Sequence, residues 1–327
     1  MEAPQTLYQQ AAKHFTLTLY LRSKTEVAGQ LIIELADAFL SDLLFPGCRL
    51  TDLHTKRAGM GTKLNMGGFT AARWKAAKRK VLAGEYAVVW IRAQMPDFPN
   101  QTIDLTTHVN PPGGDEVLEA GTIEVSCSIA YLRHLAASPQ KVEALLRLAT
   151  QAWNSVDGGP AYGYGNIALT LARPVFDPRV PPAPGTPFPV PYIKPPEERV
   201  HAVPVAYVGN DIEGNLASLY CKDLGIKGAF WASFLSAPYV AMAGGEETLR
   251  RQLNGMRVDR LSHGGLLVVA TDTPLPDDTE ATREQFARLH TALRPAFLSR
   301  EAMSDNRRGM LGYFYRERPY GGTDGSS

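Results

Sequence analysis

Histidines are the first side chains to consider for chemistry, because imidazole acts both as a general base and as a metal ligand near neutral pH. None of the seven stands in an H-x-x-x-H or H-E-x-x-H pattern, and none lies at zinc-site spacing from a cysteine. We therefore expect each to be a surface residue or a hydrogen-bonded polar residue. They are His14, His54, His108, His134, His201, His263 and His290.

Nucleophile and phosphate motifs are also missing. The chain has no G-x-S-x-G, so a hydrolase of that type lacks the position of its serine. Residues 59–63 read GMGTK and resemble a phosphate loop superficially. Such a loop needs a glycine directly before the lysine and Ser or Thr after it, whereas here Thr62 precedes Lys63 and Leu64 follows it. We interpret this segment as a turn.

Asp277, Asp278 and Glu280 form an acidic cluster of the kind that binds calcium or magnesium through carboxylate oxygens. The cluster also stands at the start of a predicted helix. Carboxylates there bind free N–H groups and meet the positive end of the helix dipole. Capping explains the cluster without a metal, so we expect no metal and no cofactor.

Composition limits the class of protein. Cys48, Cys127 and Cys221 are widely spaced and odd in number, which favours reduced thiols. The 34 basic and 33 acidic residues nearly cancel, which argues against a protein that coats nucleic acid. No apolar run approaches the ~18 residues of a membrane span, and no signal-peptide pattern opens the chain. We expect a cytoplasmic protein without membrane or direct nucleic-acid contacts.

Strand and helix patterns alternate through the first part of the chain. Strand patterns cover 15–21, 86–91 and 122–132. A capping box at Ser23–Glu26 predicts one helix start, and Ser138 followed by Pro139 predicts another. The inward positions of these two helices are Val27, Leu31, Leu35, Phe39 and Leu43, and Val142, Leu145, Leu146, Ala149 and Trp153.

A third helix pattern, 71–82, is the most basic segment of the chain. A solvated helix face explains it more simply than a contact with nucleic acid or an acidic partner. Its basic residues are Arg73, Lys75, Lys78, Arg79 and Lys80. We place all four tryptophans in the core, because each lies in a periodic segment; they are Trp74, Trp90, Trp153 and Trp231.

Residues 174–196 hold ten of the 24 prolines and predict an extended connector. Beyond it, strand patterns recur near 226–234, 256–261 and 266–271, and helix patterns follow Gly245 and cover 278–293. The predicted fold class is α+β, with two related halves that are each a mainly antiparallel sheet covered by helices. The expected division is an N-terminal half 1–172, a Pro-rich connector 173–200, a C-terminal half 201–320 and a disordered tail 321–327.

Several segments resemble the type VI secretion immunity family, long known only as a domain of unknown function. They are IKG-x-x-W at 226–231, PY-x-x-x-x-GG at 238–245, GGLLV at 264–268, L-x-P at 293–295 and DGGPAYGYGNIAL at 157–169. The resemblance covers roughly residues 120–300. It departs from the family pattern at 271–279, where the chain reads TDTPLPDDT.

The resemblance implies an immunity protein rather than an enzyme. Such a protein binds a cognate type VI toxin, in some members a VRR-type nuclease, and occludes its active or substrate-binding surface. We expect the protein to be a monomer or a homodimer. Nuclease substrate clefts are basic, so acidic loops are our candidates for toxin binding. These candidates are Asp211, Glu213, Asp277, Asp278 and Glu280. An enzyme with an unrecognised scattered active site, or an adaptor of the secretion machinery, remains an open alternative.

Overall fold

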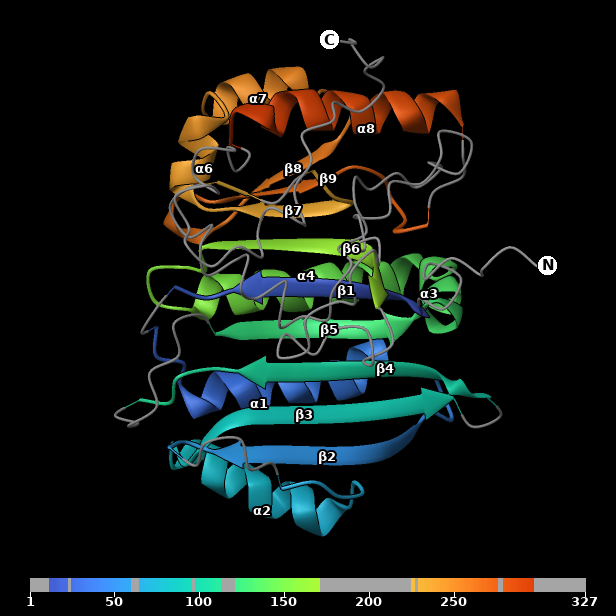
Figure 1. The fold of residues 1–327 in the computed structure, drawn as a ribbon, viewed down its shortest axis with the longest axis vertical. Coiled ribbons are helices and arrows are strands. Elements are labelled where there is room, and N and C mark those ends of the chain that lie inside the picture. The colour runs from blue at the N-terminus through green and yellow to red at the C-terminus, as the bar shows by residue number, and fades with distance from the viewer. Residues whose placement is uncertain are drawn as a thin grey trace, which may run out of the picture.

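A computed structural model describes residues 12–22, 25–59, 65–95, 98–112, 121–170, 225–226, 229–275 and 279–296. Within these ranges one sheet of nine strands runs the length of the molecule (Figure 1), in the order β2-β3-β4-β5-β1-β6-β7-β9-β8. Every neighbouring pair is antiparallel. This sheet and its helices confirm the α+β class.

The strands are β1 Ala12–Tyr20, β2 Arg49–Arg57, β3 Tyr86–Met95, β4 Phe98–His108, β5 Thr122–Ser128, β6 Tyr162–Thr170, β7 Ala232–Leu235, β8 Arg257–Arg260 and β9 Leu266–Val269. The helices are α1 Gly29–Ala38, which continues as a π-turn Phe39–Leu43, α2 Ala71–Leu82, α3 Ile129–Ala136, α4 Pro139–Ser155, α6 Ala237–Met242, α7 Glu246–Gln252 and α8 Glu280–Leu293. Short 3-10 turns cover Ser262–Gly264 and Arg294–Ala296.

Strands from both sides of the Pro-rich segment belong to the same sheet. β6 pairs with β7, with Gly165 opposite Ala232 and Tyr162 opposite Leu235. The prediction of two related halves, each with its own sheet, is not confirmed. The predicted connector lies outside the described residues.

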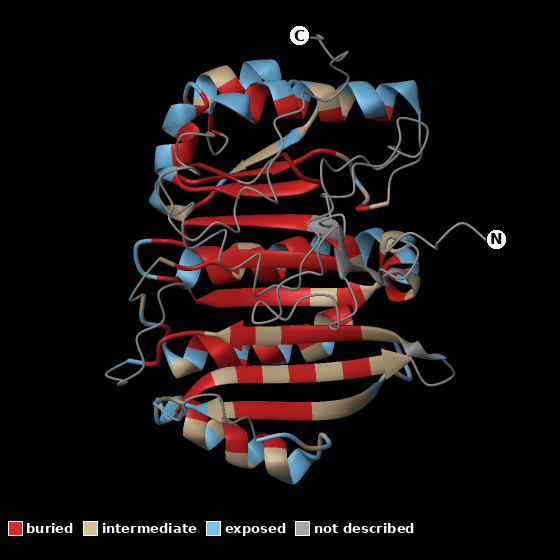
Figure 2. Ribbon diagram, viewed as in Figure 1, coloured by how far each residue is buried: buried red, intermediate tan, exposed pale blue. Residues whose placement is uncertain are grey.

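Two hydrophobic clusters lie on opposite faces of this sheet. The larger one packs α1–α4 against side chains such as Leu19, Ile91 and Phe234. The second packs α6–α8 against the other face, through side chains such as Tyr164 and Leu235. Because neighbours along a strand point to opposite faces, Phe234 and Leu235 join different clusters. Figure 2 shows the consequence: β6, β7 and β9 are buried along the parts whose burial is described, whereas β3 alternates between buried and half-buried residues.

The predicted helix stripes are confirmed, since all ten inward positions are buried. The start of the first helix is not at the capping box, however. α1 begins at Gly29 and has no side-chain cap. Glu26 instead bridges to Asn110, and the Val27 N–H donates to the Asn110 carbonyl at 2.8 Å. This pairing keeps the chain extended up to the helix.

Two further boundaries differ from the sequence prediction. The strand predicted for 122–132 ends at Ser128, because the Ser128 hydroxyl accepts the Tyr131 N–H at 3.2 Å and caps α3. Among the described residues, the strand predicted near 226–234 begins only at Ala232, as β7, and Pro238 stands in the first turn of α6. Among the described helices, none combines the length and hydrophobicity that crossing a membrane requires.

Candidate functional site

The face of β2, β3 and β4 that turns away from α1–α4 carries several polar side chains around Trp90. We call it the polar face and define it by Asp52, His54, Trp90, Arg92, Asp104 and Thr106. Strand pairing places these residues in two rows across the strands, Asp52–Arg92–Asp104 and His54–Trp90–Thr106. Neither hydrophobic cluster of the described residues includes any of the six.

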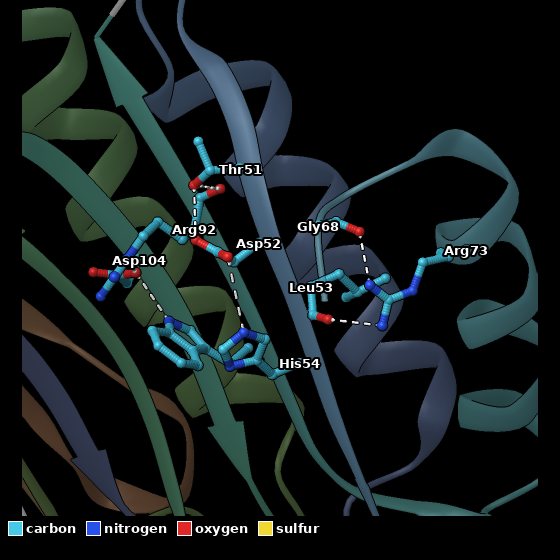
Figure 3. Close-up of polar contacts among 9 residues, drawn as sticks. Thr51, Asp52, Leu53, His54, Gly68, Arg73, Arg92 and Asp104 are labelled. Atoms are coloured by element: carbon cyan, nitrogen blue, oxygen red, sulfur yellow. Dashed lines mark hydrogen bonds and ion pairs between the residues drawn. The ribbon is translucent and has the colours of Figure 1, made fainter. Parts of the chain in front are cut away.

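Asp104 anchors the centre of the polar face (Figure 3). Its Oδ1 accepts the Trp90 indole N–H at 2.9 Å and the Arg92 Nε–H at 2.7 Å. Burial raises the pKa of this carboxyl, and the hydrogen bond from Arg92 opposes that rise. The charged carboxylate is thus held by the same two neighbours that it orients.

Arg92 lies over the Trp90 ring, with its Cζ 4.7 Å from the ring centroid. This distance is within the range of a cation–π contact. Both side chains remain partly exposed, and 37% of the Arg92 side chain is accessible. The prediction that all four tryptophans belong to the core is therefore wrong for Trp90, whereas Trp74, Trp153 and Trp231 are buried.

His54 lies beside this pair, with its ring edge-on to the Trp90 ring at a centroid distance of 4.2 Å. Its Nε2 is 3.9 Å from Asp52 Oδ1, which is an ion-pair distance only if the imidazole is protonated. Burial lowers the pKa of His54, and nearby Asp52 opposes that shift. A neutral His54 follows. Within the described structure its buried Nδ1 has no hydrogen-bond partner.

Thr51, Asp52 and His54 supply a hydroxyl, a carboxylate and an imidazole, the three groups of a hydrolytic triad. Their order is wrong for catalysis. The Thr51 hydroxyl donates to Asp52 at 2.9 Å, whereas a triad needs the imidazole between hydroxyl and carboxylate. No set of three His, Cys, Asp or Glu residues in the described ranges could hold a metal ion.

Among the predicted toxin-binding residues, only Glu280 is described. It is exposed in the first turn of α8, whose cap is the Thr279 hydroxyl bound to the Thr282 N–H at 3.2 Å. Figure 1 shows α8 at the opposite end of the sheet from β2. The structure thus does not bring Glu280 together with the polar face. Asp211, Glu213, Asp277 and Asp278 lie outside the described residues.

The basic helix α2 has several of its charges engaged within the chain. Arg73 donates to the Gly68 carbonyl at 2.8 Å and to the Leu53 carbonyl at 3.3 Å, which fixes the segment before α2 along β2 (Figure 3). Lys78 pairs with Asp37 at 2.9 Å. These contacts favour the interpretation of α2 as a solvated, structural helix face.

Two of the three cysteines, Cys48 and Cys127, lie in the described residues. Cys127 is fully packed inside β5, and burial raises the pKa of its thiol, which favours the less reactive protonated form. Cys48 is a free, half-buried cysteine, and its Sγ lies 3.5 Å from Met95 Sδ. Cys221 lies outside the described residues.

The fold is that of an α+β protein built on a long antiparallel sheet, and one face of β2–β4 carries the polar residues described above. Residues 189–311 match the model of the TsiV family, described as type VI immunity for VRR-NUC. The resemblance to the type VI immunity family is therefore confirmed over that part of the chain.

A solved structure shares the fold. The Pseudomonas aeruginosa T6SS protein PA0821 aligns with a TM-score of 0.50 and 16% sequence identity, over 88% of this chain and 74% of that chain. At this identity the likeness shows the fold alone. No curated protein matches the chain.

Proposed function

We propose that this chain is an immunity protein that binds a VRR-NUC toxin of a type VI secretion system in the cytoplasm. It neutralises the toxin by covering the active or substrate-binding surface. The observation that carries this proposal is the match of residues 189–311 to the TsiV family. The described residues agree with it, because the polar face offers binding groups without a nucleophile or metal set.

Occlusion predicts a stoichiometric mechanism. A stable inhibitor needs a complementary patch with a few buried anchors and a charged rim. We propose that the acidic residues predicted from the sequence, Asp211, Glu213, Asp277, Asp278 and Glu280, contribute to that rim and steer a basic nuclease cleft. Rim charges act mainly on the association rate, so each acid-to-amide change should weaken binding only modestly.

Co-expression tests the proposal in cells. The full-length VRR-NUC protein encoded in the same genome should kill when it is expressed in the cytoplasm, and this chain without an export signal should restore growth. Rescue only when both proteins are exported to the periplasm would refute the cytoplasmic site of action. No rescue in either compartment would refute the immunity function.

A nuclease titration separates occlusion from the alternatives. Purified chain should abolish DNA cleavage at a one-to-one ratio, and active toxin should return after the complex is dissociated. Inactivation by much less than one equivalent would instead indicate an enzyme acting on the toxin. An adaptor of the secretion machinery would bind the toxin and leave its cleavage rate unchanged.

A further inference from the structure

Trp90 and Arg92 are two large side chains that the sheet holds in place and leaves partly exposed on the polar face. Tryptophan and arginine are enriched among the few residues that dominate protein–protein binding energies. Their position is unusual in this chain, because the other three tryptophans are buried. The cross-strand contacts of the pair explain why both side chains are ordered, but not why Trp90 stays partly exposed.

The Arg92 guanidinium is fixed before any partner arrives. Its Nε–H is bound to Asp104 at 2.7 Å, and its plane lies over the Trp90 ring at 4.7 Å. Trp90 is fixed in turn, since its N–H binds the same Asp104 oxygen. Side chains ordered in advance lose less conformational entropy on binding. Binding of a partner to this pair therefore costs little side-chain conformational entropy.

The free edge of Arg92 determines the chemistry of that partner. Within the described structure the only hydrogen bond of the Arg92 guanidinium uses Nε, so the two terminal nitrogens, Nη1 and Nη2, have no partner there. Their paired N–H groups match the two oxygens of a carboxylate. Enzymes that cleave phosphodiesters hold their divalent metals with carboxylates, so an inhibitor that enters such a cleft meets acidic groups there.

The groups next to this anchor complete a mixed surface. Asp52 has 35% of its side chain exposed, and neutral His54 keeps a buried Nδ1 without a partner in the described ranges. The Asp52 carboxylate accepts hydrogen bonds, which suits an N–H donor of the toxin beside the carboxylate that Arg92 would bind. A nuclease cleft presents basic and acidic groups close together, in keeping with this arrangement.

We propose that the polar face around Trp90 and Arg92 is the surface that binds the VRR-NUC toxin. Arg92 pairs through Nη1 and Nη2 with a carboxylate of the toxin, and apolar groups of the toxin cover the exposed part of the Trp90 ring. This assignment rests on the proposed immunity function. It adds the binding surface and the chemical class of the group that is recognised.

Calorimetric titration of the full-length VRR-NUC toxin encoded in the same genome tests this assignment. Arg92→Gln removes the charge, Arg92→Lys keeps the charge but removes the planar fork, and Trp90→Phe keeps a ring but removes the indole. Arg92→Gln should weaken binding by about 30-fold or more, the lower limit for a strong anchor. Arg92→Lys should lose most of the same affinity, because a point charge cannot bind both oxygens.

The matched control is Arg147→Gln on α4, which packs on the other face of the sheet. Arg147 is 59% exposed and also makes a single carboxylate pair, to Asp42 at 2.7 Å. This variant should bind like the wild type. Thermal unfolding of every variant identifies losses that come from misfolding, and Trp90→Phe provides a second readout if Arg92→Gln unfolds early.

Each outcome is decisive. Wild-type binding with a loss confined to folded Trp90 and Arg92 variants supports the assignment. Affinity within threefold of the wild type for folded Arg92→Gln overturns it and leaves the immunity function intact. Equal losses for Arg92→Gln and Arg147→Gln indicate a dependence on overall charge and overturn it too. Absence of both binding and nuclease inhibition by the wild type refutes the immunity function itself.

Discussion

Trp231→Ala tests whether Trp231 of the IKG-x-x-W segment serves the core or the interface. Trp231 is 1% exposed. Its ring meets Phe15 edge-on at a centroid distance of 5.8 Å, and its N–H donates to the Thr271 carbonyl at 2.8 Å. The added Cβ of a residue in place of Gly165 would lie only 3.1 Å from the indole. The side chain therefore fills its site completely.

The expected destabilisation follows from two losses. A buried tryptophan truncated to alanine costs about 3–5 kcal/mol in packing and cavity formation. The orphaned Thr271 carbonyl adds about 1–3 kcal/mol if water cannot replace the indole N–H. A domain of this kind has a total stability of about 5–15 kcal/mol, so the variant should be close to unfolding. Urea unfolding followed by circular dichroism measures the change.

Trp231→Phe is the matched control, because its ring refills most of the space while the N–H is still lost. Its midpoint should fall between those of the wild type and Trp231→Ala. A Trp231→Ala protein that unfolds at the wild-type urea concentration but no longer binds toxin would refute this reasoning. It would show that the indole is an interface anchor.

Four further predictions follow from individual residues. Gly29→Ala should destabilise the protein in urea unfolding, because the new Cβ would lie 2.1 Å from the Val81 carbonyl oxygen and drive α1 from α2. Gly158→Ala, at φ +70° with open space around it, should cost only about 1 kcal/mol in the same assay. Burial, with a smaller effect of Arg294, lowers the pKa of His290 to about 4. Since the unfolded value is about 6.5, the unfolded chain takes up the proton first; stability should be complete above pH ~6.5 and decline towards pH ~4, and His290→Gln should flatten that decline in urea midpoints. Toxin affinity measured over a salt series should fall only modestly, because the net charge is +1 and long-range attraction is screened beyond about 10 Å at 0.1 M salt.

The buried faces of the helices could be predicted from the sequence, and so could those helix starts that a local residue pattern marks. The positions from Val142 to Trp153 recur at helical spacing and all point into the core. Pro139 stands at the start of α4, as its missing N–H requires. The strands predicted near 256–261 and 266–271 were equally local, and they correspond to β8 and β9, which pair across a short turn. Short-range periodicity determines these features, so a single segment suffices to recognise them.

The polar face could not be predicted in the same way. Trp90 lies in the strand pattern YAVVWI, and its large apolar ring favoured the core. Only the pairing of β3 with β4 reveals that Arg92 stands opposite Asp104, 12 residues along the chain, and that Asp104 also binds Trp90. Trp90 differs from its buried neighbours Val89 and Ile91 because successive side chains of a strand point to opposite faces of the sheet. A weak sequence signal for the polar face was present, because Arg92 and Gln94 alternate with apolar residues and share their strand face with Trp90.

The distribution of helices explains why such a face exists. A nine-stranded sheet has two faces to cover, and α1–α4 supply apolar cover for one of them. On the other face, α6–α8 pack over the region of β6, β7 and β9, so strands there are buried on both sides. β3 lies well away from that second helix layer, and its alternating burial shows that only one of its faces needs apolar residues. The packing of the core therefore does not determine the identity of Trp90 and Arg92, so these two side chains can serve binding. We therefore propose that β2–β4 recognise the toxin, while buried Ile226 and Trp231 maintain the fold.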